Sequence, residues 1–167
     1  PKYRAEFNDY DEVVQSWDTA QGKKEINNPS VCITFKRKGS KWHITNVLKE
    51  RMAYPMLKTM AIGLEQSDHP DTILIEYKSS GMSLIQDLEE NQDKDYPVIK
   101  IEPEADKVTR METQLATVAA GTILLPDIEF VDAPWLAEFL TNIMGYPTPS
   151  EWDEIDALSQ FLKWLRK

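Results

Sequence analysis

The stretch Val13-Val14-Gln15-Ser16-Trp17-Asp18 decides the fold, because it predicts a buried β-strand that ends in a carboxylate. Side chains alternate between the two faces of a strand, so Val14, Ser16 and Asp18 should share one face. An acid at the end of a central strand is costly unless it is paired or bound to a metal ion. The stretch therefore predicts both the centre of a sheet and the first residue of a functional site.

The segments that follow predict a mixed α/β sheet. Residues 31–38 and 41–52 flank the turn Gly39-Ser40 and read as a hairpin, so three antiparallel strands come in succession. Short apolar strands then alternate with segments of helical spacing. The strands are 72–76 and 98–101, the helices begin near 54, 82, 106, 133 and 150, and 123–126 is a brief extended piece. We expect a five-stranded α/β sheet, three antiparallel strands and then parallel ones, with helices on both faces.

Length and composition indicate one globular domain. We expect residues 1–12 to be a lead-in and residues 13–167 to form the domain. No run of about 18 apolar residues occurs, which predicts no membrane span. The single cysteine, Cys32, lies in an apolar strand pattern, so neither a disulfide framework nor a thiolate zinc site is available and a reducing, cytoplasmic compartment is expected.

The net charge of −9 argues against a nucleic-acid partner, since phosphates attract basic surfaces. Acids that belong to a metal site weaken this argument, because bound cations invert the local charge.

Three further acids are candidates for such a site. Glu76 follows an apolar strand, and α/β sheets place their sites beyond the carboxyl ends of parallel strands. Asp153 and Asp156 lie three residues apart on one side of the last helix. If the fold brings these acids to Asp18, the cluster could hold divalent metal ions, because hard cations such as Mg²⁺ take oxygen ligands.

Each acid also has a structural interpretation. Asp18 could cap the turn at Thr19, and Glu76 could be a solvated strand end. Asp153 lies near a helix N-terminus, where Ser150 could cap and where the helix dipole favours acids. The metal site therefore depends on the combination of these acids.

Several basic residues could contact phosphate or simply be solvated. Lys78 follows Glu76 at a helix start, and Lys107 and Arg110 lie one turn apart. The most basic short stretch, residues 36–41, crosses the hairpin turn. The sequence contains no nucleotide-binding Gly-x-x-x-x-Gly-Lys loop, no Gly-x-Ser-x-Gly elbow and no His-Glu-x-x-His motif.

Taken in order, the motifs resemble those of a known family. Gln15-Ser16-Trp17-Asp18-Thr19-Ala20, the segment 74–81, the segment 106–110 and the segment 153–159 resemble the C-terminal nuclease domain of the phage terminase large subunit. The resemblance covers nearly the whole chain, from about residue 12 to its end. It implies an RNase H-like fold, related to RuvC resolvases, and a metal-dependent endonuclease that cuts concatemeric double-stranded DNA during packaging.

The resemblance also implies residue roles. Asp18, Glu76 and Asp156 would be ligands of two Mg²⁺ or Mn²⁺ ions, and Asp153 a further ligand or helper. Contact with DNA is implied for Lys78, Lys107 and Arg110. Relatives often show another Asp where this chain has Trp152, which leaves the ligand set on the last helix open.

The partners implied are double-stranded DNA, the terminase ATPase domain that is absent from this chain, the portal and the small terminase subunit. No membrane is implied, and the location would be the host cytoplasm of a phage or prophage. Two alternatives stay open. One is a RuvC-like junction resolvase, and the other is a docking module of the packaging motor whose acids bind no metal.

Overall fold

The computed structural model describes residues 1–20, 28–78, 80–90, 97–102, 121–145 and 153–166. Its sheet has seven strands in the order β1-β7-β4-β3-β2-β5-β6. The strands are β1 (Lys2–Tyr3), β2 (Glu12–Asp18), β3 (Pro29–Lys38), β4 (Lys41–Arg51), β5 (Thr72–Glu76), β6 (Val98–Ile101) and β7 (Ile123–Pro126). The helices are α1 (Tyr54–Asp68), α2 (Ser80–Glu89), α4 (Leu136–Met144) and α5 (Asp153–Leu165).

The centre of the sheet is the predicted antiparallel unit. β2 pairs with β3, and β3 pairs with β4 across the hairpin. Gly39 has a φ of +61°, a left-handed conformation that a two-residue hairpin turn requires and that glycine adopts without strain. The hairpin predicted from Gly39-Ser40 is confirmed.

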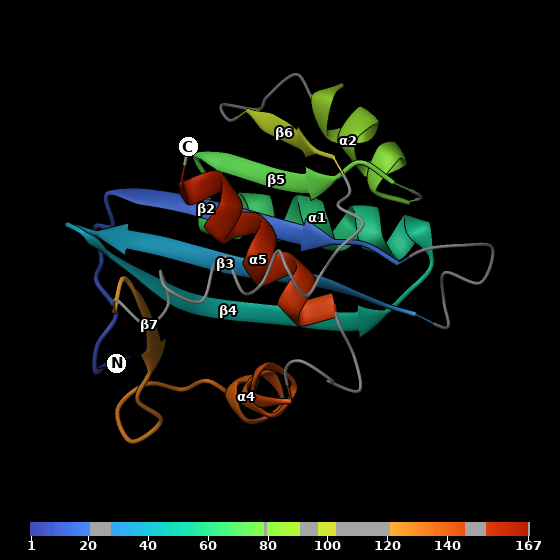
Figure 1. Cartoon of the computed structure of the whole chain (residues 1–167). Helices are drawn as coiled ribbons and strands as arrows, with labels where there is room; N and C mark the ends of the chain where they lie inside the picture. The colour runs from blue at the N-terminus through green and yellow to red at the C-terminus, as the bar shows by residue number, and fades with distance from the viewer. Residues whose placement is uncertain (21–27, 79, 91–96, 103–120, 146–152, 167) are drawn as a thin grey trace.

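The remaining two predicted strands of the sheet pair in parallel on the β2 side. β5 pairs with β2 and β6 pairs with β5, both in the parallel sense. Since β3 is antiparallel to both β2 and β4, the strands β2, β4, β5 and β6 all run the same way (Figure 1). Their carboxyl ends therefore lie at one edge of the sheet, and we call this the carboxyl edge.

Helices cover both faces, as predicted. In Figure 1, α5 crosses one face and α1 and α2 lie behind the other. Val14 and Leu74 pack in the core on the α5 side, whereas Trp17 and Ile75 pack in the core against α1 and α2. Phe161 of α5 stacks on Phe35 of β3 with ring centroids 3.7 Å apart. The period-two alternation predicted for residues 13–18 is thus confirmed.

The helix boundaries differ slightly from the predictions. α1 begins at Tyr54 as predicted, with Pro55 in its first turn, and it is capped at its end by His69 in a left-handed conformation (φ 49°). α4 begins at Leu136, about one turn later than expected. The helix expected over 106–120 lies outside the described residues.

The sheet is wider than predicted, with seven strands in place of five. The extended piece 123–126 is β7, which pairs parallel with β4, and β1 pairs parallel with β7. β1 lies in the segment expected to be a lead-in, yet Tyr3 is only 5% exposed and its hydroxyl donates to the Ile44 carbonyl at 2.7 Å. Strands this short cannot show the alternation by which a sequence reveals a strand. Within the described ranges, no helix has the length and apolar character needed to cross a membrane.

Candidate active site

The acids at the ends of β2 and β5 point to the same face of the sheet. Asp18 lies two residues after Ser16, on the face of Val14, and Glu76 lies two residues after Leu74. The strands are adjacent, and Trp17 pairs with Ile75, so the next residues on each strand are the two acids. Asp18 is 3% exposed and Glu76 is 4% exposed. The fold therefore places two buried acids side by side at the carboxyl edge, under α5.

The first turn of α5 brings two more acids to this edge. Asp156 is buried and Asp153 is half-buried. Figure 1 shows α5 starting near the carboxyl edge and running back across the sheet. The Ser16 hydroxyl donates to the carbonyl of Ala157 at 2.8 Å. This hydrogen bond ties the residue that follows Asp156 on α5 to the residue two positions before Asp18 on β2.

The electrostatics show that all four acids share one neighbourhood. Burial raises the pKa of Asp18 well above its ordinary value, and the carboxylates of Asp156, Asp153 and Glu76 raise this pKa further. Lys78 opposes the shift. The Oδ1 atom of Asp18 is buried without a hydrogen-bond partner in the described part of the chain. Such an atom is energetically costly unless a proton or a cation neutralises the group.

Lys78 places a cation beside these acids. Its Nζ lies 2.5 Å from Oε1 of Glu76, and its side chain is 21% exposed. The backbone N–H of Lys78 donates to the Glu76 carbonyl at 3.0 Å. Lys78 therefore lies at the site, as its position after Glu76 suggested, and it neutralises part of the local negative charge.

Gly81 allows α2 to begin directly beside Glu76. A Cβ atom at this position would lie 2.3 Å from the Glu76 carbonyl oxygen and 3.1 Å from Oγ1 of Thr19. Ser80 donates its hydroxyl to the Ala20 carbonyl at 2.7 Å, so the start of α2 is also tied to the chain just after Asp18. The motif 74–81 thus contains a packing requirement in addition to its acid.

Other basic candidates lie elsewhere or outside the described residues. Lys107 and Arg110 belong to the undescribed range 103–120. The basic hairpin turn lies at the opposite edge of the sheet, because Arg37 pairs with Glu12 at the start of β2. Its cations also contact acids, with Arg37 3.3 Å from Glu12 and Lys38 3.3 Å from Asp9. The hairpin turn does not contribute to the carboxyl-edge site.

The chemistry of the four acids suits a divalent metal ion, although their side chains do not converge on one point. Among the described residues, no group of three or more His, Cys, Asp or Glu side chains stands at metal-binding spacing. Glu76 instead faces Lys78. The donor set of carboxylate oxygens, with one buried oxygen of Asp18 unpaired, fits a hard cation such as Mg²⁺ or Mn²⁺.

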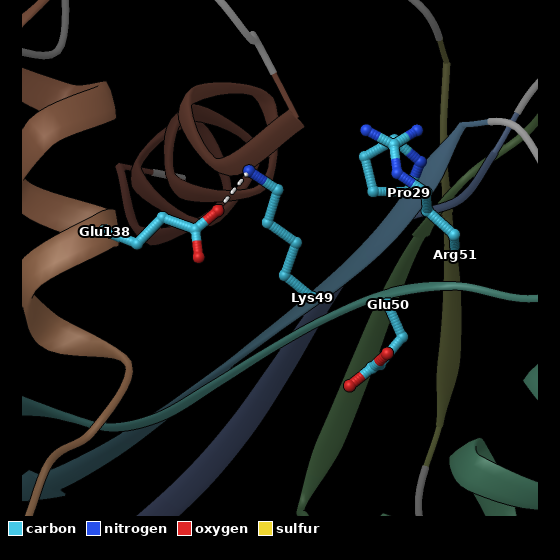
Figure 2. Close-up of a pocket in the computed structure, with 5 residues that line it drawn as sticks. All are labelled: Pro29, Lys49, Glu50, Arg51 and Glu138. Atoms are coloured by element: carbon cyan, nitrogen blue, oxygen red, sulfur yellow. Dashed lines mark hydrogen bonds and ion pairs between the residues drawn. The ribbon is translucent and has the colours of Figure 1, made fainter.

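A separate polar cluster joins α5 to α4 and β4. Lys49 lies 2.8 Å from Glu154, which is 2% exposed, and 3.1 Å from Glu138. Asn142 donates to Glu154 at 3.0 Å. Figure 2 shows Lys49 reaching toward Glu138 across a pocket of about 310 Å³, which the described residues Pro29, Lys49, Glu50, Arg51 and Glu138 line. This pocket lacks the predicted acids, and we assign it no part in the chemistry.

Two polar residues of the site were not predicted from the sequence as functional candidates. Gln160 and Ser16 are buried between α5, β2 and β5, and they hydrogen-bond to one another. The only available signal was spacing, since Gln160 lies one helical turn after Asp156. A single glutamine in a helix does not reveal its partners on distant strands.

A mixed sheet whose adjacent parallel strands end in buried acids, crossed by a helix that carries further acids, defines an RNase H-like domain. The family described as the terminase RNaseH-like domain matches residues 15–163, and the chain belongs to this family. The resemblance predicted from the motifs is confirmed. No curated protein matches the chain.

Solved structures with a similar fold include terminases from bacteriophages and from human cytomegalovirus. The large terminase of the thermophilic bacteriophage D6E has a TM-score of 0.62 at 11% identity, with 98% of this chain and 42% of that chain covered. The human cytomegalovirus terminase nuclease domain has a TM-score of 0.60 at 14% identity, with 96% and 87% covered. The nuclease domain of the large terminase of bacteriophage SPP1 has a TM-score of 0.61 at 12% identity, with 93% and 87% covered. This chain therefore spans less than half the length of the D6E protein.

Proposed function

We propose that this chain is the metal-dependent endonuclease domain of a viral DNA-packaging terminase and cuts concatemeric double-stranded DNA. The observation that carries the proposal is Asp18, a buried acid with an unpaired oxygen and with Glu76, Asp153 and Asp156 as electrostatic neighbours. Family membership supports the packaging role. Structures of similar nuclease domains soaked with Mn, from human cytomegalovirus, or with bound Mn, from SPP1, support a divalent metal ion.

The acids have distinct proposed roles. Asp18, Glu76 and Asp156 would hold the metal ions, and Asp153, which is less buried, would be a further ligand or would orient one. When bound, a pair of Mg²⁺ or Mn²⁺ ions would activate water for attack on phosphorus and stabilise the departing oxygen. Rigid elements hold all of these acids, since Asp18 and Glu76 end sheet strands and Asp156 lies in a helix. Such rigidity limits the reorganisation needed when substrate binds.

Lys78 is proposed to contact the DNA backbone. Its ammonium group is paired with Glu76 and partly exposed, so it could exchange this carboxylate for a phosphate oxygen when the acids bind metal. Lys107 and Arg110 keep their predicted role in DNA binding. The terminase ATPase domain, the portal and the small terminase subunit are the proposed protein partners, in the cytoplasm of the host cell.

Cleavage of supercoiled plasmid tests this proposal. The purified chain is incubated with Mn²⁺, Mg²⁺ or EDTA, next to the variants Asp18→Asn and Glu138→Gln. Glu138 is the control, because it is an acid of α4 and lines the separate pocket. We expect metal-dependent linearisation that Asp18→Asn abolishes and Glu138→Gln retains. Full activity of Asp18→Asn would refute the assignment.

A docking module of the packaging motor is the second candidate. The observation that favours it is the net charge of −9, which disfavours the approach of DNA phosphates. Calorimetric titration with Mn²⁺ separates the two candidates. Binding that Asp18→Asn weakens supports the nuclease, and absence of binding supports the docking module.

A further inference from the structure

We propose that Gln160 is a positioning residue that sets the relative placement of Asp18, Glu76 and Asp156 and thereby the metal affinity of the site. This inference rests on the proposed function, because it concerns the same acids. Gln160 is 3% exposed and touches none of them through a hydrogen bond that the structure describes. Its effect is therefore exerted through the backbone segments that carry the acids.

The amide of Gln160 joins three elements. Its Nε2 donates to the Ser16 hydroxyl at 3.0 Å and to the Trp17 carbonyl at 3.1 Å, both on β2. The Leu74 carbonyl on β5 lies 3.4 Å from the same nitrogen. An amide nitrogen has only two hydrogens, so the contact to Leu74 is the weak, shared one. A single side chain of α5 thus bonds to β2 and reaches the adjacent strand β5.

Ser16 completes a directed chain of hydrogen bonds. It accepts from Gln160 and donates its own proton to the Ala157 carbonyl at 2.8 Å. This series of hydrogen bonds starts on α5 at Gln160, passes through Ser16, and ends on α5 at Ala157, one residue after Asp156. The two hydrogen bonds fix both the translation and the rotation of α5 over β2, because hydrogen bonds are directional, whereas apolar contacts are not.

Each anchor lies within four residues along the chain of an acid. Ser16 precedes Asp18 by two residues on one strand face, and Leu74 precedes Glu76 in the same way, about 7 Å in each case. Gln160 follows Asp156 by about one helical turn, roughly 6 Å. The three acids are therefore held from a common point beneath them.

The contacts of Gln160 require a hydrogen-bond donor at this position. The nitrogen of Gln160 faces two backbone carbonyls, so an acceptor atom in its place would be repelled. A glutamate at position 160 would add a buried negative charge under a group of acids. A methionine would retain the length of the side chain and lose both donors.

The test compares Gln160→Met with Asn142→Leu. Asn142 is the matched control, because it also donates a buried hydrogen bond that holds α5, but to Glu154 on the side away from the acids. The measured quantities are the dissociation constant for Mn²⁺ by calorimetry, the Mn²⁺ concentration for half-maximal plasmid cleavage, and Tm. Supporting residues around metal sites typically affect metal affinity by about 10- to 100-fold.

We expect Gln160→Met to weaken Mn²⁺ binding at least about 10-fold and to regain much of its cleavage at saturating Mn²⁺. Asn142→Leu should lower Tm and leave the Mn²⁺ requirement unchanged. Ser16→Ala breaks the same chain of hydrogen bonds and serves as the second variant, with a weaker effect in the same direction, if Gln160→Met does not fold.

The outcomes separate this inference from the proposed function. Wild-type protein that binds Mn²⁺, together with a folded Gln160→Met or Ser16→Ala that binds it equally well, overturns the positioning role alone. Wild-type protein that neither binds Mn²⁺ nor cleaves DNA overturns the proposed function and the positioning role with it.

Discussion

Replacing Gly81 with alanine should destabilise the domain, although the same change in a helix usually stabilises. The added Cβ would lie 2.3 Å from the carbonyl oxygen of Glu76, against the roughly 3.0 Å below which real Cβ contacts do not occur. Backbone must therefore move by about 0.7 Å, because the opposing atom is not on a flexible side chain. Overpacking of this kind costs about 1–3 kcal/mol.

Gly63→Ala is the matched control. Gly63 lies within α1, and a Cβ there would meet nothing within 4 Å. Alanine in place of glycine in a helix interior stabilises by about 1 kcal/mol. The free energies of unfolding of the two variants should therefore differ by about 2–4 kcal/mol, which corresponds to a separation in Tm of roughly 4–16 °C for a domain of this size.

Thermal unfolding followed by circular dichroism measures this separation. Because the clash involves the carbonyl of Glu76 itself, Gly81→Ala should also weaken Mn²⁺ binding, which Gly63→Ala should not change. A Gly81→Ala variant as stable as Gly63→Ala, with unaltered Mn²⁺ binding, would refute the close approach of α2 to the end of β5.

Two further predictions concern buried charges. Asp18 has a raised pKa in the folded state, so the fold binds its proton more tightly than the unfolded chain does, and the free energy of unfolding should fall as pH rises from about 4 through the folded-state pKa. Asp18→Asn should remove this part of the pH dependence in urea unfolding without metal, and an identical slope in both proteins would contradict the burial of this acid. Lys49→Met should lower the free energy of unfolding by about 3–5 kcal/mol, because it leaves Glu154 buried without its cation. The double variant Lys49→Met with Glu154→Gln should recover much of this loss, and no recovery would show that the two groups are not coupled.

Local patterns in the sequence determined the central architecture. Alternation over residues 13–18 assigned Val14, Ser16 and Asp18 to one face, and the structure places Val14 in the core under α5 and Trp17 in the opposite core. The turn at Gly39 determined the hairpin. These features depend on neighbours within a few residues, where strand period and turn geometry act directly.

The sequence also contained the acids of the site, but not their final geometry. Strand ends and a helix start are local features, so the sequence alone was enough to propose Asp18, Glu76 and Asp156. Their distances to one another depend on how β5 pairs with β2 and where α5 crosses the sheet. The pairing of Glu76 with Lys78 is likewise a property of the folded chain.

Only the tertiary structure decided the remaining features. β1 and β7 are strands because β7 pairs with β4 and β1 pairs with β7. Segments this short do not show an alternation of polar and apolar residues. The partners of Gln160 lie 86 to 144 residues away along the chain. The sequence by itself determined the longer strands and the helices that bear the acids, since those properties arise from local periodicity. The structure alone decided which acids lie near one another and which backbone groups Gln160 contacts, because hydrogen bonds between distant segments leave no local pattern.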